Sequence, residues 1–518
     1  MGLCCRLTRA LGLIAAIAVL KVDLQRTFEK LEAFPLSGPL VNFKQKIVHL
    51  DLKGAPLSIA YMESVFPLVR QMGATGLLIE YEDMFPYSGP LVNFTARNHY
   101  SPNDIKRLLA AAQANNLTVM PLVQTFGHLE FSLKLSENVG LREDPTNPQA
   151  LCPSLNASVA TVREMIRQVA DLHQNHITHF HIGSDEVFVI GKCARCRRRL
   201  AVNDWTTDDL FLNHTLTVVR AVKELGLHPV MWDDMFRKVD LTKLAKYKAL
   251  TSLVDIMVWQ YSSSLSSGIV TALKKYTSLY FPGVWVASAF KGGVNPSNQM
   301  PAYELHLNNH IAWSVMAKHF EDRLNLSGIA ITGWQRFDHF TPLCELFPVS
   351  IPVLSLCLAY LNTGSFGTTV LAAVQRQLKC DHPIPLNDFD PPLMSCSYPG
   401  SNVLVAIQQF DQIQRKRQSI EAGNYYKAAM SPMNRNHNFG SPLNVRGAIA
   451  QLPDMVRLSV QVQDNLQELQ NVTDKATLRE WTETYLDPEI AWIGETLAVG
   501  AGMLTCDSWP RRPLYDEN

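Results

Sequence analysis

Two adjacent acids, Asp185 and Glu186, are the residues of this chain whose types and spacing most favour chemistry. They follow a short apolar run at 177–182. A carboxyl group beside another carboxyl has a raised pKa, and one that keeps its proton near neutral pH serves as a general acid. The alternative is that the pair begins a helix, where the helix dipole stabilises acidic side chains. The pair therefore predicts acid and base catalysis, with a purely structural role as the competing interpretation.

Carboxylates and aromatic rings recur just after other apolar runs. Carboxylates accept hydrogen bonds from hydroxyl groups, and flat rings pack against the C–H faces of a sugar, whereas a phosphate site needs glycines and cations. A single Trp is more often a core residue, but the recurrence favours a carbohydrate site. No Gly-x-Ser-x-Gly sequence follows these runs, which argues against an esterase. The residues at or just after these runs include Glu82, His128, Trp232, Asp233, Trp259, Tyr261, Trp334, Arg336 and Asp338.

Eight apolar, β-rich runs alternate with longer helical patterns and must position these residues. Ser101 followed by Pro102 and Asp104 predicts the start of one such helix. Continuous apolar runs are typical of strands covered on both faces, and eight of them over about 300 residues predict a (β/α)8 TIM barrel at 45–362. An open doubly wound sheet is the alternative, but no glycine-rich phosphate loop follows the first run. The runs are 47–52, 76–81, 117–123, 177–182, 228–232, 254–259, 284–289 and 329–334.

The sequence changes character after the barrel. A Pro-rich stretch at 381–392 predicts a linker or an ordered loop over 363–400. Helical patterns at 403–426, 443–469 and 475–504 then predict a smaller helical C-terminal region at 401–505. We expect this region to be a structural cap on the barrel and not a binding module. Segments 34–43 and 85–94 are nearly identical, a repeat for which we have no physical account.

The composition excludes some partners. The chain has 518 residues, of which 47% are hydrophobic, and its 47 basic and 47 acidic residues give no net charge. A folded protein without a basic field is not expected to bind nucleic acid or an anionic membrane surface. The basic run at 195–199 is interpreted as a solvated helix end.

The first 25 residues predict a signal peptide or signal anchor. Basic residues precede an apolar run at 10–20, which is too short to span a bilayer. An amphipathic N-terminal helix is the alternative. We expect a location in the secretory pathway, with membrane contact only through this anchor. Six glycosylation sequons weakly support that expectation; they begin at Asn93, Asn116, Asn156, Asn213, Asn325 and Asn471.

The ten cysteines leave their pairing open, although some should pair in the secretory pathway. Cys193 and Cys196 have the spacing of a metal knuckle. A zinc site would need a second pair of ligands at a suitable spacing, and none is apparent. A local disulfide or free thiols are therefore favoured, and no metal is expected.

The segment His-Ile-Gly-Ser-Asp-Glu at 181–186 resembles the His-x-Gly-x-Asp-Glu motif of family 20 glycoside hydrolases, the β-N-acetylhexosaminidases. The segments 51–56, 78–83, 124–128 and 333–336 resemble a narrower D-type branch of that family. The resemblance covers about residues 45–362. It implies an exo-acting, retaining enzyme that removes terminal β-linked GalNAc or GlcNAc from glycans, uses the substrate's own acetamido oxygen as nucleophile and needs no cofactor.

The resemblance also implies roles for individual residues. Glu186 would be the general acid and base, with a raised pKa, and Asp185 would orient the acetamido group and stabilise the developing positive charge. Trp232, Trp259 and Trp334 would form the walls of the sugar subsite. Tyr261 would bond the acetamido oxygen and His128 would lie near the acid, while Glu82, Asp233, Arg336 and Asp338 would contact hydroxyl groups.

Two departures from the family pattern fit the D-type branch. Lys53 stands where many members have an Arg that grips sugar hydroxyls, and we expect no α+β domain before residue 47, because too few residues precede it for one. That branch is described as nucleocytoplasmic and as favouring galactosaminides, so its location is the alternative to the secretory one.

Two other functions compete: a non-catalytic glycan-binding protein that keeps the aromatic pocket, and an unrelated barrel hydrolase. The acid pair and the additional matching segments favour the enzyme. The sequence leaves open the preference between GalNAc and GlcNAc and whether the protein forms a homodimer.

Overall fold

The computed structural model describes residues 42–386 and 393–514. Within them, eight parallel strands close into a barrel in the order β1, β10, β9, β8, β7, β6, β3, β2. This confirms the predicted fold. The barrel strands are β1 (Gln45–Asp51), β2 (Gly76–Glu80), β3 (Thr118–Leu122), β6 (His179–His181), β7 (His228–Trp232), β8 (Asp255–Trp259), β9 (Val284–Lys291) and β10 (Leu326–Gly333). Each lies within or overlaps one of the predicted runs. The predicted leader at 1–25 and most of the first repeat copy lie outside the described residues.

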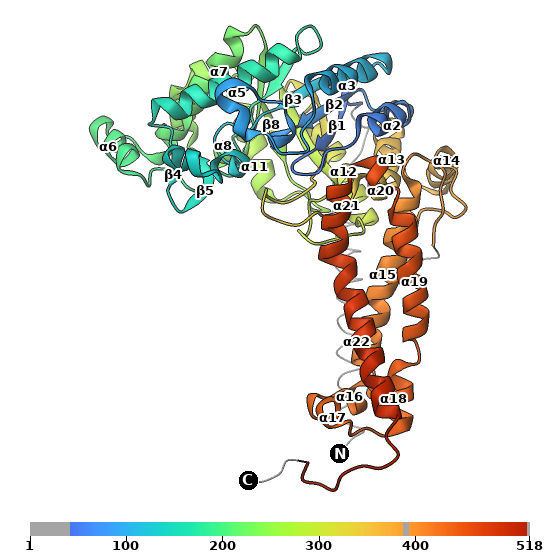
Figure 1. Ribbon diagram of the computed structural model, residues 1–518. Helices are drawn as coiled ribbons and strands as arrows, with labels where there is room; N and C mark the ends of the chain where they lie inside the picture. Colours follow the sequence, from blue (N-terminus) through green and yellow to red (C-terminus); the bar gives the residue numbers. More distant parts are fainter. Residues whose placement is uncertain (1–41, 387–392, 515–518) are drawn as a thin grey trace, which may run out of the picture.

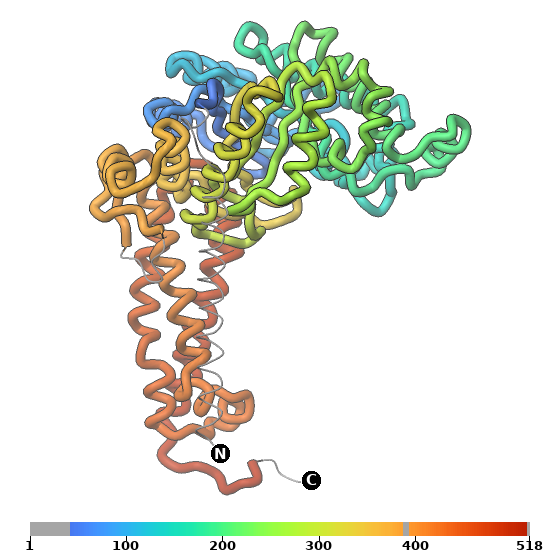
Figure 2. Tube along the Cα trace, turned by 180° about the vertical axis from the view of Figure 1, so that it is seen from behind, coloured from blue at the N-terminus to red at the C-terminus, as the bar shows by residue number. Residues whose placement is uncertain are grey.

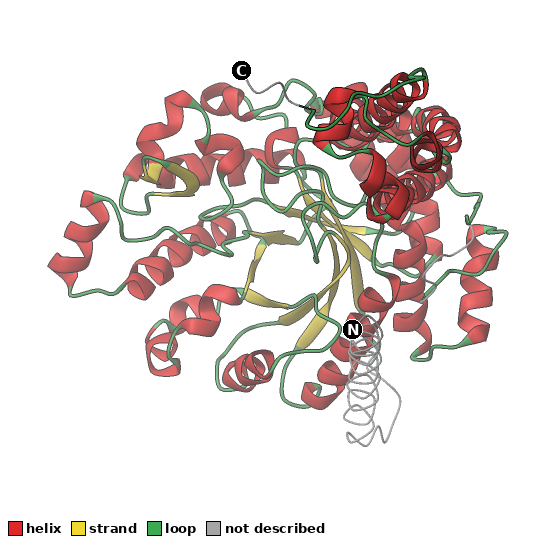
Figure 3. Cartoon of the chain, turned by 90° about the horizontal axis from the view of Figure 1, so that it is seen from below, coloured by secondary structure: helices red, strands yellow, loops and turns green. Residues whose placement is uncertain are grey.

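Helices surround the barrel, as the view from below shows (Figure 3). They are α2 (Ile59–Gln71), α3 (Pro102–Ala114), α4 (Glu130–Leu133), α5 (Asn156–Leu172), α6 (Ala194–Asn203), α7 (Thr207–Glu224), α8 (Asp234–Lys238), α9 (Leu241–Lys246), α10 (Lys248–Thr251), α11 (Ser267–Tyr276), α12 (Tyr303–Phe320) and α13 (Phe347–Thr363). Short 3₁₀ turns lie at η1 (Glu82–Met84), η2 (Gly89–Phe94) and η3 (Ser136–Leu141). The predicted helix start is confirmed: Ser101 and Asp104 form a capping box at α3.

Two apolar cores explain why the strands read as continuous apolar runs. One lies between the strands and the surrounding helices. The other fills the barrel interior and includes Leu78, Val230, Met257 and Trp285. Most strand residues are therefore buried whichever face they point to.

One structure that the sequence did not predict is a small hairpin between β3 and α5. Its strands are β4 (Arg142–Asp144) and β5 (Asn147–Leu151), paired antiparallel. Three residues and five residues are too few to show an alternation of apolar and polar side chains.

The region 363–400 is more structured than a linker. It contains α14 (Thr368–Leu378) and a disulfide between Cys380 and Cys396. Residues 387–392 within it are not described.

The helical C-terminal region is confirmed, but it is not only a cap. Its long helices α15, α19 and α22 run side by side away from the barrel, and the short helices α16 to α18 lie at the far end (Figures 1 and 2). The elements are α15 (Ser401–Ala422), α16 (Asn424–Ala429), α17 (Pro432–His437), α18 (Pro442–Ile449), α19 (Leu452–Leu466), α20 (Leu469–Val472), α21 (Lys475–Trp481), a π-helical turn η4 (Thr482–Leu486) and α22 (Asp487–Leu504). No helix in the described part of the chain is long and apolar enough to cross a membrane.

The near end of this bundle contacts loops at the carboxyl ends of the barrel strands. Trp481 is fully buried, and its indole N–H donates to Gln299 in the loop after β9 over 2.7 Å. Its ring also lies 5.0 Å from that of Phe410 on α15. Tyr485 donates to the Leu343 carbonyl in the loop after β10 over 2.6 Å. The bundle thus supports the rim of the barrel.

Replacing Trp481 with Ala should destabilise this junction by about 3–5 kcal/mol, because it opens a cavity and leaves Gln299 without its donor. Chemical denaturation followed by circular dichroism measures the effect as a lower midpoint. The matched control is Trp509→Ala, because Trp509 is 40% exposed. Equal midpoints for the two variants would contradict the assigned role of Trp481.

Candidate active site

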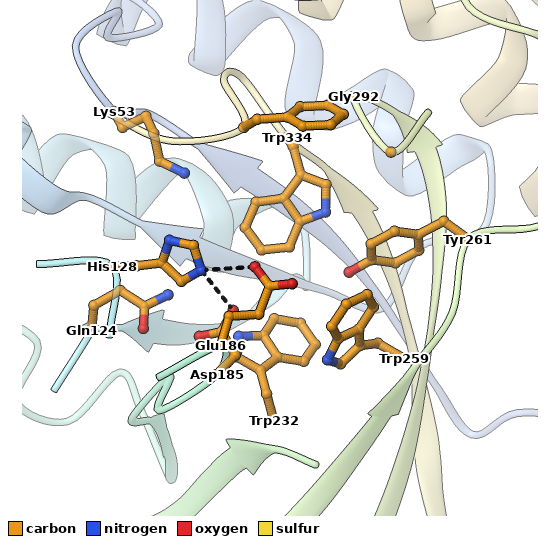
Figure 4. A pocket seen from close by; sticks show the side chains of 12 residues that line it. Lys53, Gln124, His128, Asp185, Glu186, Trp232, Trp259, Tyr261, Gly292 and Trp334 are labelled. Carbon is orange, nitrogen blue, oxygen red and sulfur yellow. Dashed lines mark hydrogen bonds and ion pairs between the residues drawn. The ribbon is translucent and has the colours of Figure 1, made fainter. Parts of the chain in front are cut away.

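A pocket of about 180 Å³ opens at the carboxyl ends of the barrel strands. Figure 4 shows its side chains converging from different strand ends. The lining contains Asp185, Glu186, His128, Trp232, Trp259, Tyr261, Trp334, Lys53, Gln124, Gly292, Gly293 and Phe337. Seven of the eleven residues predicted from the sequence therefore meet in one pocket.

The loop after β6 carries both acids in an unusual backbone conformation. Gly183, Ser184 and Glu186 have φ values of 61°, 66° and 44°. A Cβ on Gly183 would lie 2.0 Å from the side-chain oxygen of Gln124, so any other residue would both force Gln124 to shift and strain a backbone with positive φ. Left-handed non-glycine residues cluster at functional sites, where the surrounding structure holds them in place.

Neighbouring polar groups hold that loop. Burial lowers the pKa of His181 to about 3, so its ring is neutral, and its Nδ1 accepts the Gly183 N–H over 3.0 Å. The hydroxyl of Ser184 lies 2.9 Å from that of Thr125. The His, Gly and Ser positions of the 181–186 motif are thus explained by the conformation of the loop.

The backbone of Glu186 is held from both sides. Its N–H donates to Asp234 Oδ2 over 2.9 Å, and its carbonyl accepts from Gln149 Nε2 over 2.7 Å. Asp234 Oδ1 also accepts the indole N–H of Trp259 over 3.3 Å. Asp234 therefore links the acid loop to one wall of the pocket.

The two acids differ in exposure. The Asp185 side chain is 9% exposed, whereas that of Glu186 is 37% exposed. Burial raises the pKa of Asp185 to about 7; His128 opposes this rise, and the charges of Asp234, Glu80 and Glu186 add to it. Asp185 Oδ1 is buried and receives no hydrogen bond from any described residue. It is therefore available to a donor on a ligand.

His128 contacts both acids. Its Nε2 lies 3.2 Å from Glu186 Oε2 and 3.7 Å from Asp185 Oδ2, the contacts drawn as dashed lines in Figure 4. Burial alone would lower the pKa of His128, but the charge of Asp185 and the hydrogen bond to Glu186 outweigh it and raise the pKa to about 10. A protonated imidazole therefore lies beside both acids.

Aromatic rings form the walls. Trp259 and Tyr261 stack with ring centroids 5.2 Å apart, and Trp334 lies 6.0 Å from Trp232 and 6.4 Å from Tyr261. Trp232, Trp259 and Trp334 also pack on the apolar core inside the barrel. The three tryptophans are therefore core residues and lining residues of the pocket at the same time.

Four predicted hydroxyl-binding residues do not line the pocket, because their side chains bond elsewhere. Buried Asp233 is ion-paired with Arg237, which lies over the Trp259 ring. Arg336 bonds Glu480 of α21, and Asp338 accepts N–H groups within its own turn.

Glu82, the fourth of these residues, is buried beside Lys53 and His339. Glu82, Asp83 and His339 have the spacing of a metal site. The Lys53 ammonium lies 3.8 Å from Glu82 and supplies the positive charge there. This arrangement fits an ion-pair cluster.

Lys53 and Gln124 are the polar lining residues that the predicted set did not include. Lys53 is buried, pairs with Asp51 over 3.1 Å and lies 5.2 Å from the centre of the Trp334 ring. Gln124 donates to Glu80 over 3.1 Å. Each follows the end of a barrel strand, and this position is the feature of the sequence that could have identified it as a lining residue.

Comparisons with known proteins show which proteins the chain resembles. The model of the glycosyl hydrolase family 20 catalytic domain matches residues 61–335. Hexosaminidase D from Homo sapiens is 40% identical over 457 residues, covering 86% of this chain and 92% of that protein. Hexosaminidase D from Bos taurus is 42% identical over 336 residues, covering 64% and 96% respectively.

Solved structures share the fold at low identity. A β-N-acetylhexosaminidase from Bacteroides fragilis matches with a TM-score of 0.50 and 14% identity, over 65% of this chain and 70% of that one. An inactive variant of an exo β-N-acetylglucosaminidase from Vibrio harveyi also has a TM-score of 0.50, with 15% identity over 65% and 57%.

Replacing Gly183 with Ala should distort the acid loop. A left-handed conformation costs a non-glycine residue about 1–2 kcal/mol, and the collision with Gln124 adds to this cost. The expected result is a lower midpoint of thermal unfolding. Gly140→Ala is the control, because nothing lies within 4 Å of the added Cβ there. If Gly183→Ala unfolded at the same temperature as this control, the loop would not need glycine.

Proposed function

Because the chain belongs to glycosyl hydrolase family 20, we propose that Asp185 and Glu186 catalyse the removal of terminal β-linked N-acetylhexosamine in this pocket. The family and the hexosaminidase relatives make the chain a β-N-acetylhexosaminidase. Catalysis assisted by the substrate's 2-acetamido group is typical of this family. The proposal assigns the steps of that mechanism to residues of this chain.

Asp185 orients the acetamido group. Asp185 lines a pocket walled by aromatic rings, and the observation that carries this role is its buried Oδ1, which receives no hydrogen bond from the described residues. It accepts the acetamido N–H, so that the acetamido oxygen faces C1 of the sugar. As the oxygen–C1 bond forms, a positive charge develops on the acetamido group, and the nearby carboxylate stabilises it.

Glu186 moves the proton. Its greater exposure supports this role, because the leaving group departs toward solvent. Its carboxyl group protonates the glycosidic oxygen as the C1–oxygen bond breaks. The resulting carboxylate then takes a proton from water, whose oxygen attacks C1 and reopens the oxazolinium ring. Two displacements at C1 retain the β configuration.

The aromatic residues hold the sugar ring and exclude water. Figure 4 shows the hydroxyl of Tyr261 and the carboxyl of Glu186 pointing toward one another across the pocket. Tyr261 donates to the acetamido oxygen, while Trp232, Trp259 and Trp334 surround the acetamido methyl and the ring. Removing water strengthens the electrostatic interactions of both acids.

Lys53 contacts the sugar hydroxyls in place of the Arg that many family members have. It is a buried cation in the pocket lining. GalNAc and GlcNAc differ only in the direction of the C4 hydroxyl, and we propose that this pocket accepts both and prefers the galactosaminide, as in the D-type branch.

Purified protein should hydrolyse aryl β-N-acetylgalactosaminide faster than the matched glucosaminide, and an oxazoline-mimicking thiazoline should inhibit both reactions. Glu186→Gln should lower kcat by about 10²–10⁴-fold while thiazoline binding survives. Asp185→Asn should weaken thiazoline binding as well, because the proposed N–H acceptor has lost its charge.

The matched control for these variants is Glu224→Gln, because Glu224 is exposed on α7 far from the pocket lining. It should keep wild-type kinetics. Normal turnover by Glu186→Gln would refute its role as the acid. Thiazoline-insensitive turnover would refute the acetamido mechanism, and a faster glucosaminide would reverse the sugar preference.

The charge of His128 should set the acid limb of the pH profile. Asp185 acts as a carboxylate, so activity is lost as the pH falls through its pKa. His128 lowers that pKa, and His128→Gln removes its positive charge, so the pKa of Asp185 should rise further. The acid limb of kcat/KM should therefore move to higher pH, as measured with an aryl substrate.

The control is His176→Gln, at an exposed position, which should leave the acid limb at its wild-type pH. A limb that moved to lower pH in His128→Gln would contradict the assignment.

A further inference from the structure

Outside the pocket, four side chains of the types that can bind metal ions lie close together. Glu143 lies on β4, Cys152 directly follows β5, and Cys193 and Cys196 lie at the start of α6. One ligand atom from each lies within 4.8 Å of those of the other three. The three cysteines are free thiols, so a disulfide between Cys193 and Cys196 is not what the structure shows.

The distances in this cluster match a shared cation. The Cys152 sulfur lies 3.4 Å from that of Cys193 and 3.7 Å from that of Cys196. A disulfide would bring two sulfurs to about 2.05 Å. Zinc with Zn–S bonds of about 2.3 Å in tetrahedral geometry places two sulfur ligands about 3.8 Å apart. The Cys196 sulfur also lies 3.1 Å from Glu143 Oε2.

We propose that Glu143, Cys152, Cys193 and Cys196 bind one Zn²⁺ ion as a closed structural site. Three thiolates select zinc over the hard cations Ca²⁺ and Mg²⁺, which take oxygen ligands. Four protein ligands complete the tetrahedron, and a complete set is typical of structural zinc and not of catalytic zinc.

Bonds from the backbone orient these ligands. Glu143 Oε1 accepts the N–H groups of Lys192 over 2.6 Å and Cys193 over 3.0 Å, which directs Oε2 toward the sulfurs. The Cys196 N–H donates to the Cys193 sulfur over 3.2 Å. Such outer contacts fix the ligands of a metal site before the ion binds.

The surroundings suit a buried site with excess negative charge. Cys152 and Cys196 are fully buried against Leu210. Three thiolates and one carboxylate around Zn²⁺ carry a net charge of about −2 by their formal charges. Arg195 interacts with the sulfur of Cys152. The basic run at 195–199, interpreted from the sequence as a solvated helix end, thus includes a counter-charge for this cluster.

The ion would support the acid loop at two points. Cys193 follows Glu186 by seven residues along the same loop. Cys152 follows β5, from which Gln149 donates to the Glu186 carbonyl. Zinc would therefore join the loop to the hairpin that holds it. This consequence rests on the proposed function, whereas zinc binding itself does not.

The first experiment measures zinc in the full wild-type chain, purified without a metal-affinity tag and dialysed against metal-free buffer. Elemental analysis should find about one zinc per chain. Replacement with Co²⁺ should produce the absorption of a thiolate-to-cobalt charge transfer. Protein that retains no zinc and gives no cobalt spectrum would overturn the proposal, as would a disulfide among these cysteines in unreduced peptides.

Variants then locate the ion. Cys196→Ser and Cys193→Ser should lose the zinc, whereas Cys506→Ser, at a free cysteine outside the cluster, should keep it. Zinc retained at full stoichiometry in both cluster variants would place it elsewhere. If these variants fail to fold, the zinc content and the cobalt spectrum of the wild-type chain still show whether it binds zinc through thiolates.

Removing the ion tests its link to the acid loop. A strong chelator should lower the unfolding midpoint and reduce kcat by about tenfold to a hundredfold, because a displaced Glu186 is poorly aligned, and added Zn²⁺ should restore both. Full turnover by zinc-free protein would overturn the link to Glu186. Zinc in a protein without hydrolase activity would instead refute the proposed function and leave the metal site standing.

Discussion

Closure of the barrel between β1 and β10 is the constraint on which the rest of the structure depends. The two strands pair in parallel from Gln45 with Gly328 to Val48 with Ile331. Parallel closure brings all carboxyl ends to one rim, so residues far apart in the chain become neighbours. The Gln335 N–H donates to Asp51 over 2.8 Å, and Lys53 lies against Trp334. Without closure, the first and last strands could not share a pocket.

Within that rim, the loop after β6 concentrates conformational strain and charge. Its left-handed residues would relax in an isolated peptide, and they persist because Gln149 and Asp234 bond the backbone of Glu186 from two sides. The same packing removes Asp185 from water, which raises its pKa, and places His128 beside both acids to limit that rise. Backbone strain, burial and charge therefore act together on two adjacent residues.

The support of this loop extends beyond the barrel. The hairpin of β4 and β5 supplies Gln149 to the acid loop and Glu143 and Cys152 to the cysteine cluster. In addition, Asp233 and Arg237 brace Trp259, and the helical bundle reaches the rim through Arg336 and Glu480. Asp233 and Arg336, which the sequence suggested as sugar contacts, thus lie behind the residues that line the pocket. They hold the parts of the protein that line the pocket.

The sequence by itself determined the barrel, the helical C-terminal region and the acid pair. These features are readable because they are local: a strand buried on both faces is a continuous apolar run, and the 181–186 motif places both acids next to one another. It also placed the three tryptophans correctly, since each lies at or directly after the end of a barrel strand.

Only the tertiary structure decided what depends on distant partners. Whether Asp233 or Asp234 bonds Glu186 depends on the turn after β7, and the direction of Arg336 depends on Glu480, 144 residues away. Cys193 and Cys196 have the spacing of a metal knuckle, but the sequence showed no second pair of ligands. The two side chains that join them, Cys152 and Glu143, come from a hairpin too short to leave a periodic pattern. Periodicity reports which face of an element is buried, but it does not report which side chains from other elements meet there, since folding of the whole chain brings those contacts together.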